Sequence, residues 1–248
     1  MDKNNKRVAL VTGATGGLGT AMCKKLVDDG YTVVGNYRNK EKADEWMKTM
    51  NAEGYNIQLF AGDVSDFEAT GKMMTEIESQ VGAIDILVNN AGITKDSRLI
   101  NMKVEDWHAV INTNLNSVFN CTKQVIQGMI DRNFGRIINI SSVNGQRGQF
   151  GQTNYSAAKA GMHGFTKSLS MEVAKLGITV NTISPGYIAT DMVMAVPEKV
   201  LNQIVAQVPM GRLGGTHEVA HLVSFLASDE TSFITGANYS INGGQHVY

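Results

Sequence analysis

The feature that most constrains the fold is an end-to-end alternation between short β-branched runs and longer amphipathic stretches. The short runs have the length and composition of buried strands, and they occupy residues 7–12, 32–37, 57–61, 84–89, 136–141, 179–184 and 239–241. Helical periodicity fills most of the intervals, including residues 17–29, 67–80, 104–131 and 155–176. Because apolar strands separated by helices are typical of a parallel sheet covered on both faces, the pattern predicts a doubly wound α/β fold.

Length and composition indicate that one such domain spans residues 1–248. A chain of 248 residues, 43% of them hydrophobic, can bury a large core within a single domain. The three prolines, Pro185, Pro197 and Pro209, confine irregular structure to the C-terminal third, and no linker or charge run breaks the alternation. We therefore expect a single-domain Rossmann fold with helices on both faces of the sheet.

Charge and cysteine content exclude several classes of function. A formal net charge of -1 gives no electrostatic footprint for nucleic acid or for an anionic membrane, and no apolar run is long enough to span a bilayer. Two cysteines in a chain of this size suggest reduced thiols rather than a disulfide framework. The polar residues 1–7 lack the pattern of a signal peptide, so we expect a cytoplasmic protein.

A glycine-rich turn lies between the first strand and the first helix. Glycines at this place permit a tight turn and let backbone N–H groups approach a pyrophosphate at the helix N-terminus. The spacing is G-x-x-x-G-x-G, without the lysine of a P-loop, and an ordinary turn is the alternative interpretation. Its position favours a dinucleotide cradle, with Gly13, Thr15, Gly17, Leu18 and Gly19 as candidate cofactor contacts.

The second strand predicts which dinucleotide binds. It ends in Asn36-Tyr37-Arg38, where an NAD site usually carries a carboxylate for the ribose hydroxyl. A carboxylate would repel a 2′-phosphate, whereas the Arg38 guanidinium can bind it with two hydrogen bonds. The sequence therefore favours NADPH, with Asn36 and Arg38 as contacts; a solvated loop arginine is the alternative.

Two later strand ends supply further candidates for the nucleoside. Asp63, in Gly62-Asp63-Val64, can accept a hydrogen bond from an adenine amino group, although aspartate is also a common turn residue. Asn90-Ala91-Gly92 places amide and small side chains where a ribose must lie close, and a plain turn is the competing interpretation.

Tyr155 and Lys159 are one helical turn apart and follow a strand that ends at Ser142. Side chains at i and i+4 share a helix face, so a cation beside the phenol is expected to lower the tyrosine pKa from its ordinary value near ~10. The Ser142 hydroxyl can hold a substrate carbonyl against that acid. A Tyr–Lys pair on an ordinary helix surface is the alternative.

Together these residues resemble the short-chain dehydrogenase/reductase family over essentially the whole chain. The matching segments are Thr12-Gly13, Gly17-Leu18-Gly19, Asn89-Asn90-Ala91-Gly92, Asn114, Ser142, Tyr155-x-x-x-Lys159 and Pro185-Gly186 with Thr190. The resemblance implies a seven-stranded parallel sheet, a homotetramer, and a catalytic set of Asn114, Ser142, Tyr155 and Lys159, with Asn114 holding a water in a relay to Lys159. It also implies cofactor contacts at Tyr155, Lys159, Pro185, Gly186, Ile188 and Thr190.

Residues around the tyrosine narrow the resemblance to the NADPH-dependent acetoacetyl-CoA reductases of polyhydroxybutyrate synthesis. The similarity covers residues 141–156, residues 185–192 and the tail at residues 242–246. It implies an acyl-CoA substrate, an (R)-3-hydroxy product, and substrate contacts at Asp96, Ser142, Gln149, Phe150, Gln152, Tyr155 and Tyr187.

Two related functions on the same fold stay open. The 3-oxoacyl-carrier-protein reductases tend to present basic residues where this chain has Asn133 and Leu176, although Arg132 and Lys175 stand next to them. A non-catalytic NADPH sensor is the second alternative, because fold does not imply function. Such a sensor would be expected to lack the proton donor or its lysine, and both are present.

One further string, His217-Glu218-Val219-Ala220-His221, fits the H-E-x-x-H pattern of zinc peptidases. We interpret it as a helix start, with Thr216 as the N-cap and Glu218 in the first turn, where an acid favours the helix dipole. No metal is expected.

Overall fold

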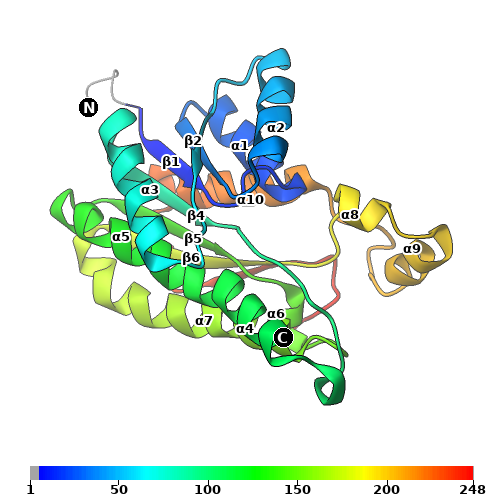
Figure 1. Cartoon of the computed structure of the whole chain (residues 1–248). Helices are drawn as coiled ribbons and strands as arrows, with labels where there is room; N and C mark the ends of the chain where they lie inside the picture. Colours follow the sequence, from blue (N-terminus) through cyan, green and yellow to red (C-terminus); the bar gives the residue numbers. More distant parts are fainter. Residues whose placement is uncertain (1–5, 248) are drawn as a thin grey trace.

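A seven-stranded parallel sheet forms the centre of the computed structural model, which describes residues 6–247, apart from the side chain of Met192 (Figure 1). The strands are β1 (Val8–Val11), β2 (Thr32–Tyr37), β3 (Gln58–Ala61), β4 (Ile84–Asn89), β5 (Gly135–Ile140), β6 (Ile178–Pro185) and β7 (Asn238–Ile241). They lie in the order β3-β2-β1-β4-β5-β6-β7, so the α/β prediction is confirmed. Most of the polar opening, residues 1–5, lies outside the described residues.

Strand bounds agree closely with the sequence prediction. β2 and β4 have the predicted bounds, and each of the others differs by one residue at one or both ends. The agreement follows from burial, since nearly every side chain of the central strands is removed from water and the apolar runs mark them directly.

Helices cover both faces of the sheet. α1 (Gly17–Asp28), α2 (Lys40–Ala52) and α10 (Thr216–Ala227) pack on one face, and α3 (Phe67–Gln80), α5 (Ser117–Asp131) and α7 (Thr153–Val173) pack on the other. A hydrophobic core lies on each face of the sheet, and alternate residues of β1 contribute to the two cores. Ala9 and Val11 face the first set of helices, and Val8 and Leu10 face the second. Complete burial of a side chain such as Leu10 contributes about 1.5–3 kcal/mol.

One expected helix is interrupted. Residues 104–131 were predicted as a single helix, but the structure has α4 (Val104–Ile111), a π-helical segment (Asn112–Asn116) and then α5. The cause is the Asn114 side chain, whose Nδ2 donates to the Val110 oxygen (2.8 Å) and to the Ile93 oxygen (2.9 Å). Such π-bulges often mark functional sites.

Strand order reverses between β1 and β4, and this switch point is where doubly wound sheets bind their ligands. Beyond the carboxyl end of β5 lies the short helix α6 (Val143–Arg147), and beyond β6 lie α8 (Asp191–Met194) and α9 (Glu198–Val205). These last two helices stand apart from the main body of the molecule in Figure 1.

The remaining elements are 3-10 turns at Leu99–Asn101, Ala174–Leu176 and Asp229–Thr231. Among residues 6–247, no helix combines the length and the apolar character that a bilayer crossing would need.

Candidate active site

A cleft of about 740 Å³ lies at the carboxyl edge of the sheet, across the switch point. Every predicted cofactor residue lines it, and so do four of the substrate candidates, of which Tyr155 belongs to both groups: Gly13, Thr15, Gly17, Leu18, Gly19, Asn36, Arg38, Gly62, Asp63, Val64, Asn90, Ala91, Gly92, Ser142, Gln152, Tyr155, Lys159, Pro185, Gly186, Tyr187, Ile188 and Thr190. Four site predictions do not line this cleft: Asp96, Asn114, Gln149 and Phe150.

The turn after β1 has the geometry of a phosphate cradle. Gly13 takes φ +63°, and a Cβ atom there would lie 3.0 Å from the Ala91 Cα atom. A methyl group at Gly19 would overlap the Gly13 carbonyl oxygen. At the start of α1, the N-cap Gly16 offers no side-chain hydrogen bond and the first turn carries no acid. Its backbone N–H groups therefore suit an anion, so the residues present fit the pyrophosphate of a dinucleotide.

Hydrogen bonds from polar side chains hold this cradle in place. The Thr12 hydroxyl accepts from the backbone N–H groups of Asn90 and Ala91, both at 3.0 Å, and Asn90 Nδ2 donates to the Thr12 oxygen at 2.9 Å. Asn36 is buried, and its Nδ2 donates to the Gly62 oxygen at 2.9 Å. These bonds join the ends of β1, β2, β3 and β4, so Asn36 and Asn90 shape the cleft wall.

The far end of the cleft carries the charges expected for a nucleotide. Arg38 has a 65% exposed side chain and lies 3.8 Å from Asp63. Although burial opposes ionisation of Asp63, hydrogen bonds from Ser65 and the Arg38 charge together hold its pKa below the ordinary value. Lys42, in the first turn of α2, lines the same end of the cleft and adds a second cation.

Ser142, Tyr155 and Lys159 meet beside the cleft wall formed by β5. Ser142 is the N-cap of α6, and its Oγ accepts from the Asn144 N–H at 3.1 Å and hydrogen bonds the Tyr155 side chain. Lys159 is 3% exposed, its Nζ donates to the Ile140 oxygen at 2.8 Å, and the same atom lies 5.6 Å from the centre of the Tyr155 ring. The sequence prediction that these three side chains converge is confirmed.

The prediction that Lys159 lowers the pKa of Tyr155 is wrong. Burial raises the pKa of Tyr155 above its ordinary value; the Ser142 hydrogen bond opposes that rise and the negative charge of Asp96 adds to it. Burial also lowers the pKa of Lys159 to about 7. The physical reason is desolvation, which disfavours both the phenolate and the ammonium and is the largest influence on each group.

Two of the substrate candidates outside the cleft, Asp96 and Gln149, hydrogen bond Gln152, which lines it. Gln152 donates from Nε2 to Asp96 (2.8 Å) and accepts at Oε1 from Asn144 Nδ2 (2.9 Å), which links three segments by side-chain amides. Gln149 lies next to them, since its backbone oxygen accepts from the Gln152 N–H at 3.1 Å. Phe150 is 83% exposed, so its ring lies on the surface of the molecule rather than in the apolar core.

Asn114 lies close to Lys159, on the other side of Gly92. A Cβ atom at Gly92 would lie 2.5 Å from Asn114 Oδ1 and 3.6 Å from Lys159 Nζ, so Gly92 separates these two side chains. Both polar atoms of the Asn114 side chain are bonded to the backbone of Ile93, which fixes the orientation of the asparagine.

One protein family matches most of this chain. The sequence model described as short chain dehydrogenase matches residues 7–201. The chain belongs to the short-chain dehydrogenase family. It is therefore an oxidoreductase with the fold and site of a nicotinamide-dependent enzyme.

Relatives of this short-chain dehydrogenase share nearly its full length. The chain is 56% identical to an acetoacetyl-CoA reductase of Allochromatium vinosum, an alignment that covers 98% of this chain and 99% of the relative. It is 53% identical to an acetoacetyl-CoA reductase of Cupriavidus necator, again over 98% and 99% of the two chains. A 3-oxoacyl-(acyl-carrier-protein) reductase of Vibrio harveyi is 46% identical over 97% and 98%.

The H-E-x-x-H string belongs to the structural part of this dehydrogenase. Glu218 accepts from the Gly215 N–H at 2.6 Å and pairs with Arg212 at 2.7 Å, and the Arg212 hydrogen bond is the main reason its pKa falls to about 2. His217 and Glu218 lie in the first turn of α10 as predicted, but the N-cap is Gly215, so the prediction of Thr216 is wrong. In the described part of the chain, no three His, Cys, Asp or Glu side chains gather as metal ligands.

Sequence reasoning missed several cleft residues. Lys42 could have been found, because it is a cation four residues beyond Arg38 in a helix that starts at the strand end. Asn144, Thr94, Thr113 and Val193 also line the cleft. They carry no separate sequence signal, since a lone Asn, Thr or Val is common in any turn or helix.

Proposed function

We propose that this short-chain dehydrogenase reduces acetoacetyl-CoA, and short 3-oxoacyl-CoA thioesters generally, to the (R)-3-hydroxyacyl-CoA with NADPH, in polyhydroxybutyrate synthesis. The observation that carries the proposal is the convergence of Ser142, Tyr155 and Lys159 on one wall of the dinucleotide cleft. The relatives named acetoacetyl-CoA reductase, at 53–56% identity over almost the full length, support this choice of substrate.

The geometry supports protonation of a carbonyl oxygen by Tyr155. When bound, NADPH supplies the hydride for C3 of the thioester. Ser142 orients the carbonyl oxygen and stabilises the charge that develops there, and Tyr155 donates its phenolic proton to that oxygen. The raised pKa of Tyr155 keeps the phenol protonated near neutral pH, which is the state that reduction requires.

Lys159 is suited to the next position in a proton relay. Its pKa of about 7 lets the amine gain and lose a proton near neutral pH. Its Nζ hydrogen bonds the Ile140 oxygen, and both residues line the cleft that would hold the nucleotide. Gly92 and the Asn114 segment lie directly behind it, where the resemblance to the family assigns a relay water.

The charges at the end of β2 support NADPH rather than NADH. Arg38 and Lys42 place two cations at the adenosine end of the cleft. A 2′-phosphate carries the charge and acceptor oxygens that a guanidinium binds well. The Asp63 carboxylate pairs with Arg38 and accepts from the Ser65 hydroxyl. It can accept a further hydrogen bond, from the amino group of the adenine.

A carrier-protein substrate is the alternative, favoured by the 46% identity to the reductase of Vibrio harveyi. Of the two basic residues next to the carrier-binding positions, Arg132 is already engaged within this chain. Arg132 lies 3.4 Å from Asp85 and donates to the Ile84 oxygen at 2.7 Å, so its guanidinium is held against the protein. Asn133 itself is uncharged and turns with φ +51°.

The resemblance also supports a cytoplasmic homotetramer. Large apolar side chains are exposed at Phe119 on α5, Met171 on α7 and Phe225 on α10, with Phe233 fully exposed just beyond. Such surfaces are usually covered by another subunit. The two free, buried cysteines, Cys23 and Cys121, suit a reducing compartment.

The direct test is NADPH fluorescence and absorbance in the presence and absence of acetoacetyl-CoA. We expect binding of NADPH followed by its oxidation when acetoacetyl-CoA is added. Binding of NADPH with no oxidation by any short 3-oxoacyl thioester would instead favour the sensor protein.

A further inference from the structure

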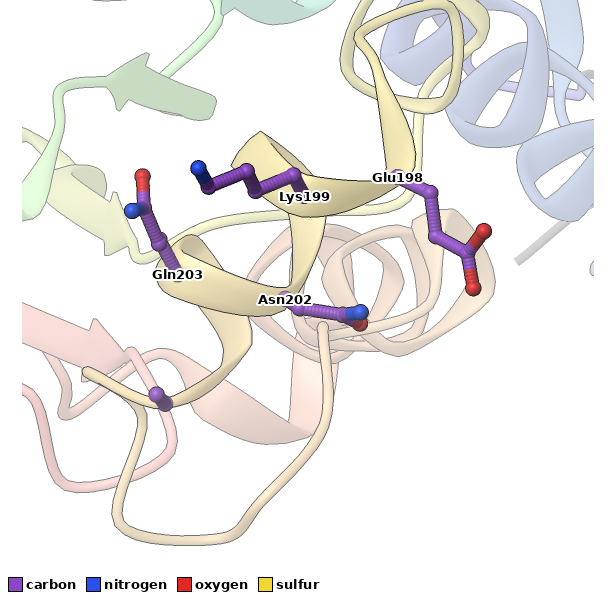
Figure 2. Close-up of a pocket in the computed structure, with 5 residues that line it drawn as sticks. Glu198, Lys199, Asn202 and Gln203 are labelled. Atoms are coloured by element: carbon purple, nitrogen blue, oxygen red, sulfur yellow. The ribbon is translucent and has the colours of Figure 1, made fainter.

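The two helices beyond β6 form a segment whose outer helix has little support of its own. We call residues 189–207, which include α8 and α9, the projecting segment. None of the described α9 side chains is buried, and a hollow of about 530 Å³ lies along the helix. Figure 2 shows Lys199 and Gln203 directed to one side of α9 and Glu198 and Asn202 to the other. The chain on either side of the segment therefore controls where it lies; we call residues 186–188 the first stem and residues 208–214 the second stem.

Both stems of the projecting segment are hydrogen bonded to one short turn near the C-terminus, residues 242–245. In the first stem, the backbone N–H of Tyr187 donates to Gln245 Oε1 at 3.0 Å. In the second stem, the backbone N–H of Met210 donates to the Gly243 oxygen at 3.1 Å. The stems also bond each other, because the Gly214 N–H donates to the Tyr187 oxygen at 3.0 Å.

The packing at this junction leaves no room for extra atoms. A Cβ atom at Gly186 would overlap Gln245 Oε1 and lie 2.8 Å from the Asn242 Cα atom. A Cβ atom at Gly243 would lie 2.7 Å from Val208 Cγ1, and one at Gly244 would lie 3.1 Å from Pro209. Gly243 and Gly244 have φ +60° and +87°, which glycine adopts readily.

The turn itself is fixed by Asn242. This residue is 7% exposed; its Oδ1 accepts from the Gly244 N–H (3.0 Å) and its Nδ2 donates to the His246 oxygen (3.1 Å). The Gln245 N–H donates to the Asn242 oxygen at 3.1 Å, which aims the Gln245 side chain at Tyr187. Gln245 Nε2 is buried and has no hydrogen-bond partner among residues 6–247, so the side chain bonds the protein through its oxygen.

We propose that Gln245 is a positioning residue, which holds Tyr187 against the acyl end of the cleft and anchors the projecting segment to the C-terminal turn. Tyr187 lines the cleft, and its backbone N–H and oxygen are both committed to the junction. A shift of this one acceptor would therefore move the Tyr187 ring relative to Ser142 and Tyr155. The inference rests on the proposed function for the identity of the acyl group, but the contact can be tested without turnover.

The test compares Gln245→Met, which keeps the shape and removes the acceptor, with Gln245→Glu, which keeps an acceptor oxygen. Gln80→Met is the matched control, because Gln80 is exposed at the end of α3 and remote from the cleft. Gly186→Ala disturbs the same contact from the other side. Hydrogen exchange of the full-length protein with NADPH is measured for the Tyr187 amide and residues 189–207, together with KM and kcat for acetoacetyl-CoA.

For Gln245→Met we expect faster exchange at Tyr187 and across the projecting segment, and a KM for acetoacetyl-CoA raised ~10-fold with the NADPH Kd unchanged. Gln245→Glu should recover most of the protection at Tyr187, and Gln80→Met should match the wild type. Exchange and KM equal to wild type in both Gln245→Met and Gly186→Ala would overturn the proposal. If the wild type does not reduce acetoacetyl-CoA, the proposed function fails, and the exchange data alone still decide whether Gln245 holds the stem.

Discussion

Lys159 carries its amino group inside the protein, where its Nζ atom donates to the Ile140 oxygen. Burial lowers the pKa of this lysine from 10.5 to about 7. Between these two values the unfolded chain binds a proton that the folded chain does not bind, so the free energy of unfolding must rise as the pH rises. The cost of burying the charge is present in full below pH ~7 and decreases above it.

We expect Lys159→Met to remove this pH dependence. The free energy of unfolding of the wild type minus that of the variant should increase from pH ~7 to ~9.5, by up to ~1.4 kcal/mol per pH unit for one proton. Loss of the bond to the Ile140 oxygen affects the variant equally at each pH and leaves the slope unchanged. Urea titrations at several pH values measure the difference; a flat difference would mean that the lysine is not desolvated.

Tyr155 is the residue on which the chemistry depends. We expect Tyr155→Phe to lower kcat by ~10²–10⁴-fold, because it removes the proton donor and leaves the ring in place. The Kd for NADPH, measured by fluorescence, should change by less than about twofold, since the phosphate contacts are untouched. Tyr55→Phe is the control, because the Tyr55 hydroxyl only approaches Asp28 at 3.5 Å. Equal losses of kcat in both variants would count against a role for the phenol as acid.

At the scale of elements, the cradle between β1 and α1 depends on the absence of a side chain at Gly19. We expect Gly19→Ala to lower the free energy of unfolding by ~1–3 kcal/mol, because its methyl group would meet the Gly13 oxygen and lie 2.8 Å from the Ala14 Cα atom. It should also weaken NADPH binding, since α1 cannot then approach the cradle as closely.

Gly164, an exposed residue within α7, provides the comparison. A Cβ atom there meets nothing within 4 Å, so Gly164→Ala should raise the free energy of unfolding by ~0.5–1 kcal/mol. Thermal and urea unfolding of the two variants measure both effects. Similar stability of the two variants would mean that the turn adapts to the added methyl group.

Elements with one dominant local signal were predictable from the sequence. β2, β4 and α3 have the predicted bounds because apolar runs and helical periodicity mark them unambiguously. The π-helical segment at Asn112–Asn116 was not predictable, because it depends on bonds between Asn114 and Ile93, which lies in the loop after β4 and is distant in the sequence. The N-cap of α10 was wrongly assigned because a glycine and a threonine both suit that position.

At the scale of the whole molecule, one rule predicted most of the site. Carboxyl ends of parallel strands meet at one edge, so Gly13, Asn90, Ser142 and Gly186 gather there although they are far apart in the sequence. The C-terminal turn escaped prediction because its role comes from a contact between Gln245 and Tyr187 rather than from a pattern. The continuous sheet and its two cores support the proposal that residues 1–248 form one domain.

The most direct measurement compares kcat/KM of the wild type on acetoacetyl-CoA and on the acetoacetyl carrier protein, each with NADPH and with NADH. We predict that acetoacetyl-CoA with NADPH is the best pair, by ~10-fold or more over each of the others. A clear preference for the carrier protein would indicate a role in fatty acid synthesis instead. A preference for NADH would contradict the proposal that Arg38 binds the 2′-phosphate of NADPH.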